Sequence, residues 1–176
     1  FIVPRKAIAE MVRLIASLDD EVTLRLDFTS NHMTVDGPGA RLVTKLIDAT
    51  YPDYSRAIPL GGDKVMLVDR QTLKDALSRT AILSNELYRN VRLILLQDRL
   101  DMYANNPQQE EAEESLIVGY NGESIEIAFN VSYLIEALSA MAGSQVRMTL
   151  SDSSSACLLE DVDEKECLYV ISPMML

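Results

Sequence analysis

The densest cluster of ionisable side chains is an acidic run in the middle of the chain. Residues 110–114 read Glu-Glu-Ala-Glu-Glu and follow a turn-forming stretch at 105–109, Asn-Asn-Pro-Gln-Gln. Grouped carboxylates can bind a divalent cation, but this run lacks the alternating Asp or Asn ligands and the glycine of a calcium-binding loop. We therefore predict a solvated or partner-facing acidic patch here, and no metal site.

Residues that commonly carry catalysis are few and scattered. His32, the only histidine, belongs to a Ser-Asn-His turn, and Cys157 and Cys167 lack the spacing of a metal-binding or redox pair. We expect a surface histidine and two reduced thiols in or beside strands. The sequence has no Ser/His/Asp set, no nucleophile-elbow, P-loop or HExxH motif, and no paired acid/base carboxylates. We therefore predict a protein that is not an enzyme and needs no metal or cofactor.

The charge balance argues against a surface that binds nucleic acid by simple attraction. The chain has 16 Lys and Arg against 27 Asp and Glu, a net charge of −11. Its cations nevertheless gather on predicted helices, where Lys6 and Arg13 lie seven residues apart and Arg70 and Lys74 four apart. A solvated helix face is the more common meaning of such a pattern. A local basic stripe therefore stays an open alternative.

Three similar units follow one another along the chain, each an amphipathic helix followed by three strands. The apolar stripes of the helices, spaced i, i+3, i+4, i+7, are Ile8, Met11, Val12 and Ile15; Leu73, Ala76, Leu77 and Thr80; and Val131, Leu134, Ile135 and Leu138. A period of about 60 residues indicates an assembly of like units rather than one catalytic core. We predict an α+β fold in which the helices of these units lie side by side.

The units group into two parts, predicted at 1–62 and 63–176. The first part ends in a two-proline stretch and a Leu-Gly-Gly linker, and it would be half of a domain with an uncovered apolar face and sheet edge. Predicted strands are 21–29, 32–36, 40–48, 65–68, 91–97, 99–105, 115–120, 124–129, 145–151, 155–161 and 167–172. Predicted helices run from Pro4 to about 17, from Arg70 to about 80, and over 131–142. Asp69 and Asn130 are the predicted N-caps, and Asn121-Gly122 is a predicted hairpin turn.

The C-terminal tail is unusually apolar. It reads Pro173-Met174-Met175-Leu176, where frayed polar residues are usual at a chain end. We expect the tail to lie against its domain and to wall an apolar groove, a role that suits methionine. No apolar run approaches the length of a membrane span, and the start has no features of a signal peptide.

Five motifs in order make the whole chain resemble the bacterial sliding clamp, the beta subunit of DNA polymerase III. They are Tyr-Pro-Asp-Tyr-Ser-Arg at 51–56, Ala-Ile-Leu-Ser-Asn-Glu at 81–86, the acidic stretch at 105–114, Phe-Asn-Val-Ser-Tyr at 129–133 and Tyr-Val-Ile-Ser-Pro-Met at 169–174. The resemblance implies the DNA-clamp fold, with helices on one face and antiparallel sheets on the other. It also implies the back half of the middle domain plus the whole third domain of three, so we expect no closed ring from this chain alone.

What the resemblance implies for function is a cytoplasmic processivity factor. The family forms a head-to-tail homodimeric ring that encircles duplex DNA and recruits the polymerase III alpha and delta subunits, and other proteins with clamp-binding motifs, through an apolar pocket. The alternative is a peptide-binding module that never encircles DNA. Neither reading involves a membrane.

The resemblance assigns three sets of residues. The peptide-binding pocket comprises Pro52, Arg56, Ala57, Tyr88, Asn130, Tyr133, Ser154, Ala156, Ser172, Pro173, Met174, Met175 and Leu176. The dimer interface comprises Ile82, Leu83, Glu110, Glu111, Glu113 and Glu114. The DNA-facing candidates are the helix cations Arg5, Lys6, Arg13, Arg70, Lys74 and Arg79. The family tail usually reads Met-Pro-Met-Arg-Leu, so Ser172 and Met175 are departures that should shift peptide preference.

Overall fold

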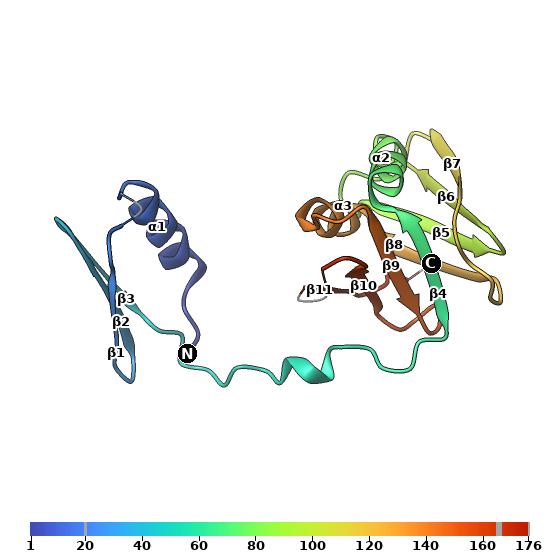
Figure 1. The fold of residues 1–176 in the computed structure, drawn as a ribbon. Helices are drawn as coiled ribbons and strands as arrows, with labels where there is room; N and C mark the ends of the chain where they lie inside the picture. Colours follow the sequence, from blue (N-terminus) through green and yellow to red (C-terminus); the bar gives the residue numbers. More distant parts are fainter. Residues whose placement is uncertain (20, 165–166, 176) are drawn as a thin grey trace. The chain divides into compact units, whose positions relative to one another are not determined.

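The computed structural model describes residues 1–19, 21–164 and 167–175, which form two compact units, Phe1–Asp53 and Tyr54–Leu176 (Figure 1). The sequence places the division at 62/63, so the two divisions differ only in the connector 54–62. That connector contains one short 3-10 helix, η1 (Tyr54–Arg56), and is counted with the second unit.

The first unit is one helix on a three-stranded antiparallel sheet. Its elements are α1 (Arg5–Ala16), β1 (Arg25–Phe28), β2 (His32–Gly37) and β3 (Ala40–Lys45), with strand order β1-β2-β3. The β2–β3 turn needs a residue with positive φ, and Gly39 supplies it at 74°. Within the described residues, β1 is paired on one side only.

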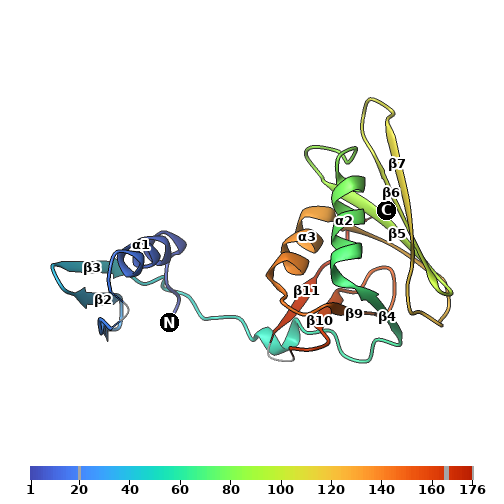
Figure 2. The same ribbon diagram turned by 45° about the horizontal axis from the view of Figure 1, so that its top comes forward.

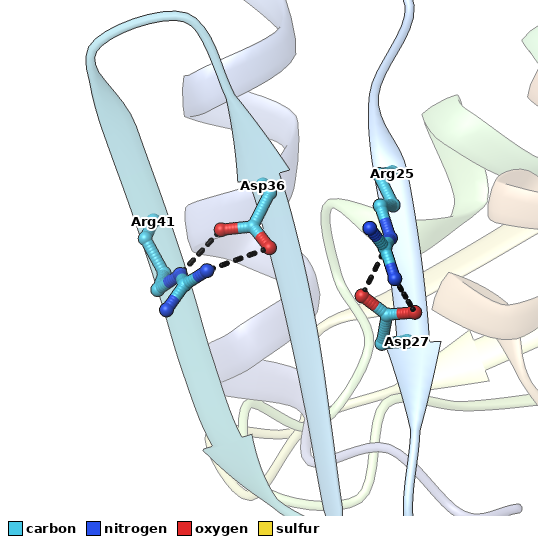
Figure 3. A network of polar contacts seen from close by, with 4 residues as sticks. All are labelled: Arg25, Asp27, Asp36 and Arg41. Atoms are coloured by element: carbon cyan, nitrogen blue, oxygen red, sulfur yellow. Dashed lines mark hydrogen bonds and ion pairs between the residues drawn. The ribbon is translucent and has the colours of Figure 1, made fainter.

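The outer face of this sheet carries surface ion pairs. Arg41 on β3 reaches across to Asp36 on β2, and Arg25 pairs with Asp27 on β1 (Figure 3). The hydrogen bond from the Arg41 guanidinium lowers the pKa of the Asp36 carboxyl. Because side chains alternate along a strand, these charges lie opposite the face that buries Met33 and Val35.

The buried face of α1 differs from the predicted one. Ala7 is buried, and Met11 and Leu14 pack on the small core of β2 and β3. Of the predicted stripe only Met11 faces this core, since Ile8, Val12 and Ile15 are 43%, 60% and 51% exposed. The helix is apolar on two adjacent faces, and the one with the small Ala7 approaches the sheet. The other face stays uncovered within this unit.

The second unit is built from two four-stranded antiparallel sheets and two helices. Its elements are β4 (Lys64–Asp69), α2 (Arg70–Ala81), β5 (Asn90–Leu96), β6 (Arg99–Asn105), β7 (Glu111–Ile117), β8 (Ile125–Asn130), α3 (Val131–Ala140), β9 (Gln145–Leu150), β10 (Cys157–Asp161) and β11 (Leu168–Ile171). The strand orders are β11-β10-β9-β4 and β7-β6-β5-β8. Each sheet therefore combines the three strands that follow one helix with the strand that precedes the other helix: β5, β6 and β7 after α2 join β8, and β9, β10 and β11 after α3 join β4.

The two helices of this unit confirm the sequence pattern. They pack against each other (Figure 2), and the stripe Leu73, Ala76, Leu77 and Thr80 is fully buried. In the predicted stripe of α3, Val131, Leu134 and Leu138 are buried and Ile135 is partly buried. Both predicted N-caps are present: Asp69 Oδ1 accepts the Thr72 N–H at 2.8 Å, and Asn130 Oδ1 accepts the Ser132 N–H at 2.9 Å.

Two sequence predictions about the middle of the chain are wrong. The strand predicted at 115–120 begins and ends earlier, because residues 111–114 of the acidic run form the first part of β7 (Glu111–Ile117), in which exposed positions alternate with half-buried ones. Charged side chains at alternate positions keep an edge strand solvated. In the sequence, such a run of charged residues does not look like a strand. The Asn121-Gly122 turn does not close a hairpin either, since β7 and β8 lie on opposite edges of one sheet.

A buried polar corner fixes the end of α3. The Arg70 guanidinium donates to the carbonyl oxygens of Gly143 (2.6 Å) and Leu138 (3.1 Å). The buried Asp161 carboxylate accepts the N–H groups of Gly143 at 2.7 Å and Asp163 at 2.9 Å, and these bonds lower its pKa. Stability from this carboxylate is therefore present above its unfolded pKa and is lost as the pH falls through the folded pKa.

Replacing Gly143 with alanine should destabilise the protein. A Cβ at this position would lie 2.1 Å from Asp161 Oδ1, so the carboxylate must move and lose its backbone donors. We expect a loss of about 2 kcal/mol, within the range for overpacking, measured by urea unfolding at pH 7. Gly119→Ala is the matched control, because its Cβ would meet Leu67 only at 3.5 Å. Equal unfolding midpoints for both variants would contradict this account.

Candidate functional site

The C-terminal tail links the two sheets of the second unit. After β11, the Met174 N–H donates to the Ala128 carbonyl oxygen at 2.7 Å, an isolated antiparallel bridge to the edge strand β8. Pro173 and Met174 are half-buried, whereas Met175 is 100% exposed. The tail thus lies against its unit and offers thioether groups at the surface. Leu176, the last predicted pocket residue, lies outside the described residues.

A hollow of about 420 Å³ lies beside this tail. Its lining residues come from three separate segments, 85–90, 105–107 and 174–175: Asn85, Tyr88, Asn90, Asn105, Asn106, Pro107, Met174 and Met175. Three of them, Tyr88, Met174 and Met175, belong to the predicted peptide pocket. Sequence reasoning missed the asparagines and Pro107, although the Asn-Asn-Pro stretch marked a turn.

Two asparagines of this hollow hold its walls in place. Asn85 Oδ1 accepts the N–H groups of Leu87 (2.9 Å) and Tyr88 (3.0 Å), which directs the 63% exposed Tyr88 side chain. Asn106 Oδ1 accepts the Gln108 and Glu110 N–H groups at 3.1 and 3.0 Å. Such side-chain caps fix a turn without any help from a partner. The hollow is therefore largely preformed.

The other predicted pocket residues of the second unit lie at the end of β8, on α3, in the β9–β10 connection and just after β11. Asn130 uses its side-chain oxygen to cap α3, so only its amide N–H groups are available to a ligand, and Tyr133 is exposed one turn later. Ser154 donates its N–H and hydroxyl to Asp152 Oδ1 at 2.8 and 2.7 Å. These bonds, the hydroxyl one first, lower the pKa of Asp152 to about 2. Ala156 is half-buried and Ser172 exposed.

The remaining pocket candidates lie at the connector. Pro52 is an exposed residue of the first unit. Arg56 ends η1, and Ala57 follows it with its N–H donated to the Tyr54 carbonyl oxygen at 2.9 Å. All three side chains are exposed.

The predicted dimer-interface residues include an exposed apolar side chain and several acidic ones. Ile82, just after α2, is 76% exposed, and Leu83 is half-buried. A hollow of about 470 Å³ is lined by Ile82, Leu87 and Glu110 among others. On β7, Glu111 and Glu113 are exposed. A large exposed apolar side chain beside rim charges is typical of a protein interface.

The helix cations proposed to face DNA differ in their surroundings. Arg5 and Lys6 are exposed on α1, and Arg13 pairs with Glu10 at 2.8 Å. Arg79 forms a two-bond ion pair with Glu114, at 2.7 and 3.1 Å, and the Arg79 guanidinium lowers the pKa of that carboxyl.

Arg70 is occupied by the carbonyl oxygens at the end of α3. Lys74 is half-buried on α2. Among the described residues, Arg5, Lys6 and Lys74 are therefore the candidates whose side chains have no hydrogen-bond or ion-pair partner, whereas the side chains of Arg13, Arg70 and Arg79 each have one.

Metal-binding clusters, reactive thiols or membrane-spanning helices in the described part of the chain would indicate other functions. No group of three or more His, Cys, Asp or Glu side chains is placed there to hold a metal ion. Burial raises the pKa of the Cys157 thiol to about 12, and Cys167 is an exposed free thiol. No helix in the described ranges has the length and apolar character to cross a membrane.

Comparison with known proteins decides the family. Residues 1–53 match the model of the DNA polymerase III beta subunit central domain, and residues 55–175 match that of its C-terminal domain. The chain belongs to the beta sliding clamp family. It is 48% identical over 175 residues to the beta sliding clamp of Pseudomonas aeruginosa and 47% identical to that of Pseudomonas putida. Both alignments cover 99% of this chain and 47% of the relative.

Solved sliding clamps share the fold as well. A crystal structure of the Pseudomonas aeruginosa clamp bound to griselimycin matches with a TM-score of 0.87 and 46% identity, covering 99% of this chain and 47% of that one. The predicted α+β clamp fold is thereby confirmed. The chain spans about half the length of the sliding clamps it matches.

Proposed function

We propose that this chain is part of a DNA polymerase processivity factor, a non-catalytic ring-shaped homodimer that encircles and slides on duplex DNA. The proposal rests on the match of both units to successive clamp domains, in one alignment of 175 residues at 47% identity. The partners would be the polymerase III alpha and delta subunits and other proteins with clamp-binding motifs, in the cytoplasm.

The acidic charge of the chain is compatible with this role. A ring holds DNA by its topology, so it needs only weak, sequence-independent attraction, and tight phosphate contacts would impede sliding. Exposed cations such as Arg5 and Lys6 on a helix suit that requirement, while the acidic excess of the chain, whose net charge is −11, keeps DNA off other surfaces.

The tail and the surfaces beside it are the proposed peptide-binding site. The half-buried Pro173 and Met174 and the exposed Met175 and Tyr133 supply apolar groups, and Asn130 has amide N–H groups to offer. Short linear motifs bind to such surfaces through a few apolar anchors and polar contacts. A solved relative carries griselimycin, which supports the presence of a ligand-binding surface in this family.

Peptide binding tests the proposal on this chain directly. The probe is a fluorescein-labelled pentapeptide that begins with Gln and ends with Leu-Phe, titrated with the 176-residue chain in a polarisation assay. We expect saturable binding, with a scrambled peptide at least about tenfold weaker, since the Leu-Phe anchors carry most of the energy. Equal binding of both peptides would contradict the peptide-binding role.

A further inference from the structure

The hollow beside Tyr88 and Met174 is also lined by Asn85, Asn90, Asn105, Asn106 and Pro107, none of which belongs to the pocket predicted from sequence. Its volume of about 420 Å³ corresponds to on the order of a dozen water molecules at about 30 Å³ each. The space is therefore enough for more than one side chain of a bound segment.

The chemistry of this hollow is neutral and rich in amides. None of the described side chains that line it is charged, although the chain as a whole carries a net charge of −11. Amide groups offer both donors and acceptors, and Met174, Met175 and Pro107 add apolar contact. Charged side chains of a ligand would find no opposite charge in this lining. A neutral polar segment fits best.

Two of the amides are available to a ligand. Asn90 begins β5 and Asn105 ends β6, two residues beyond the cross-strand pair Arg92↔Tyr103. Within the part of the chain that the structure describes, neither side-chain amide has a hydrogen-bond partner, whereas those of Asn85 and Asn106 hold their own turns. In this hollow, Asn85 and Asn106 therefore fix the walls, and Asn90 and Asn105 provide hydrogen-bond donors and acceptors for a ligand.

We propose that this amide-lined hollow is an accessory subsite for residues that flank the apolar anchor of a clamp-binding peptide. It takes neutral polar residues such as Gln, Asn, Ser or Thr, in an extended segment. The inference rests on the proposed peptide-binding function, because Tyr88, Met174 and Met175 belong to both surfaces and make them continuous. Its preformed walls reduce the ordering cost of binding.

The experiment compares the pentapeptide with two longer probes, each extended at one end by Gln-Ser-Gln. Fluorescence polarisation with the 176-residue chain measures all three. We expect one of the two extensions to strengthen binding about fivefold, the effect of roughly one net hydrogen bond. A Lys-Lys-Lys extension at the same end should strengthen binding only through attraction to the acidic chain, and that gain should disappear at high salt. Asn105→Ala should remove the gain from Gln-Ser-Gln and leave the affinity for the pentapeptide unchanged.

Asn121→Ala is the matched control, because Asn121 is exposed in the β7–β8 connection. It should keep the full gain. If the pentapeptide binds but neither extension strengthens binding, or if Asn105→Ala keeps the gain, the subsite is refuted and the proposed function stands. If the pentapeptide itself does not bind, the proposed function fails, and the subsite fails with it.

Discussion

Deleting residues 174–176 should lower the affinity for the pentapeptide about thirtyfold, equivalent to about 2 kcal/mol for the loss of an interface centre. The deletion removes the half-buried Met174, the exposed Met175 and the last residue of the proposed apolar wall. The fold should survive, because Met174 is joined to β8 by a single backbone hydrogen bond to Ala128. Polarisation measures the affinity, and a thermal melt measures the fold.

Ile117→Ala serves as the control for the tail deletion. Ile117 is 91% exposed at the end of β7, so its truncation removes a surface apolar group without touching the tail. It should leave peptide affinity unchanged. An unchanged affinity after the deletion itself, with an unchanged melting temperature, would mean that the tail is only structural and that the site assignment is wrong.

Replacing Ile82 and Leu83 with alanine should convert the proposed clamp dimer into monomers. The variant is made in a chimera that carries this chain in place of the matching part of the Pseudomonas putida clamp. Ile82 is 76% exposed here and Leu83 half-buried, so an interface centred on them loses two apolar anchors. Hot-spot truncations of about 2 kcal/mol each should weaken the dimer by about a hundredfold or more. Sedimentation velocity at nanomolar concentration measures the change.

Leu60→Ala is the control for this substitution. Leu60 is 88% exposed in the connector, and the altered chimera should remain a dimer. A double Ile82/Leu83 variant that stays dimeric at the same concentration would show that the interface lies elsewhere.

The helices of the second unit could be predicted from sequence because each has one apolar stripe and a side-chain cap. α1 shows the limit of that reasoning. It is apolar on two adjacent faces, and periodicity alone does not say that Ala7 and Leu14, rather than Ile8 and Ile15, face the sheet. The acidic strand β7 was missed because an edge strand needs little apolar character.

The site could be predicted only as far as the family resemblance reaches. The asparagine hollow depends on the approach of three segments that are distant in sequence, which no local pattern encodes. The same holds for the cations. Arg70 and Arg79 read as exposed helix charges, but their partners Gly143 and Glu114 lie 73 and 35 residues away.

If this chain is part of a ring around DNA, a clamp that contains it should be retained on closed circular DNA. The chimera with the Pseudomonas putida clamp is loaded by a clamp loader onto nicked circular DNA, and the complex is isolated by gel filtration at high salt. We expect the chimera to stay with circular DNA and to be released when a restriction enzyme linearises it, because topology and not phosphate contact holds it. A dimeric, correctly folded chimera that leaves circular and linear DNA equally fast would contradict the claim.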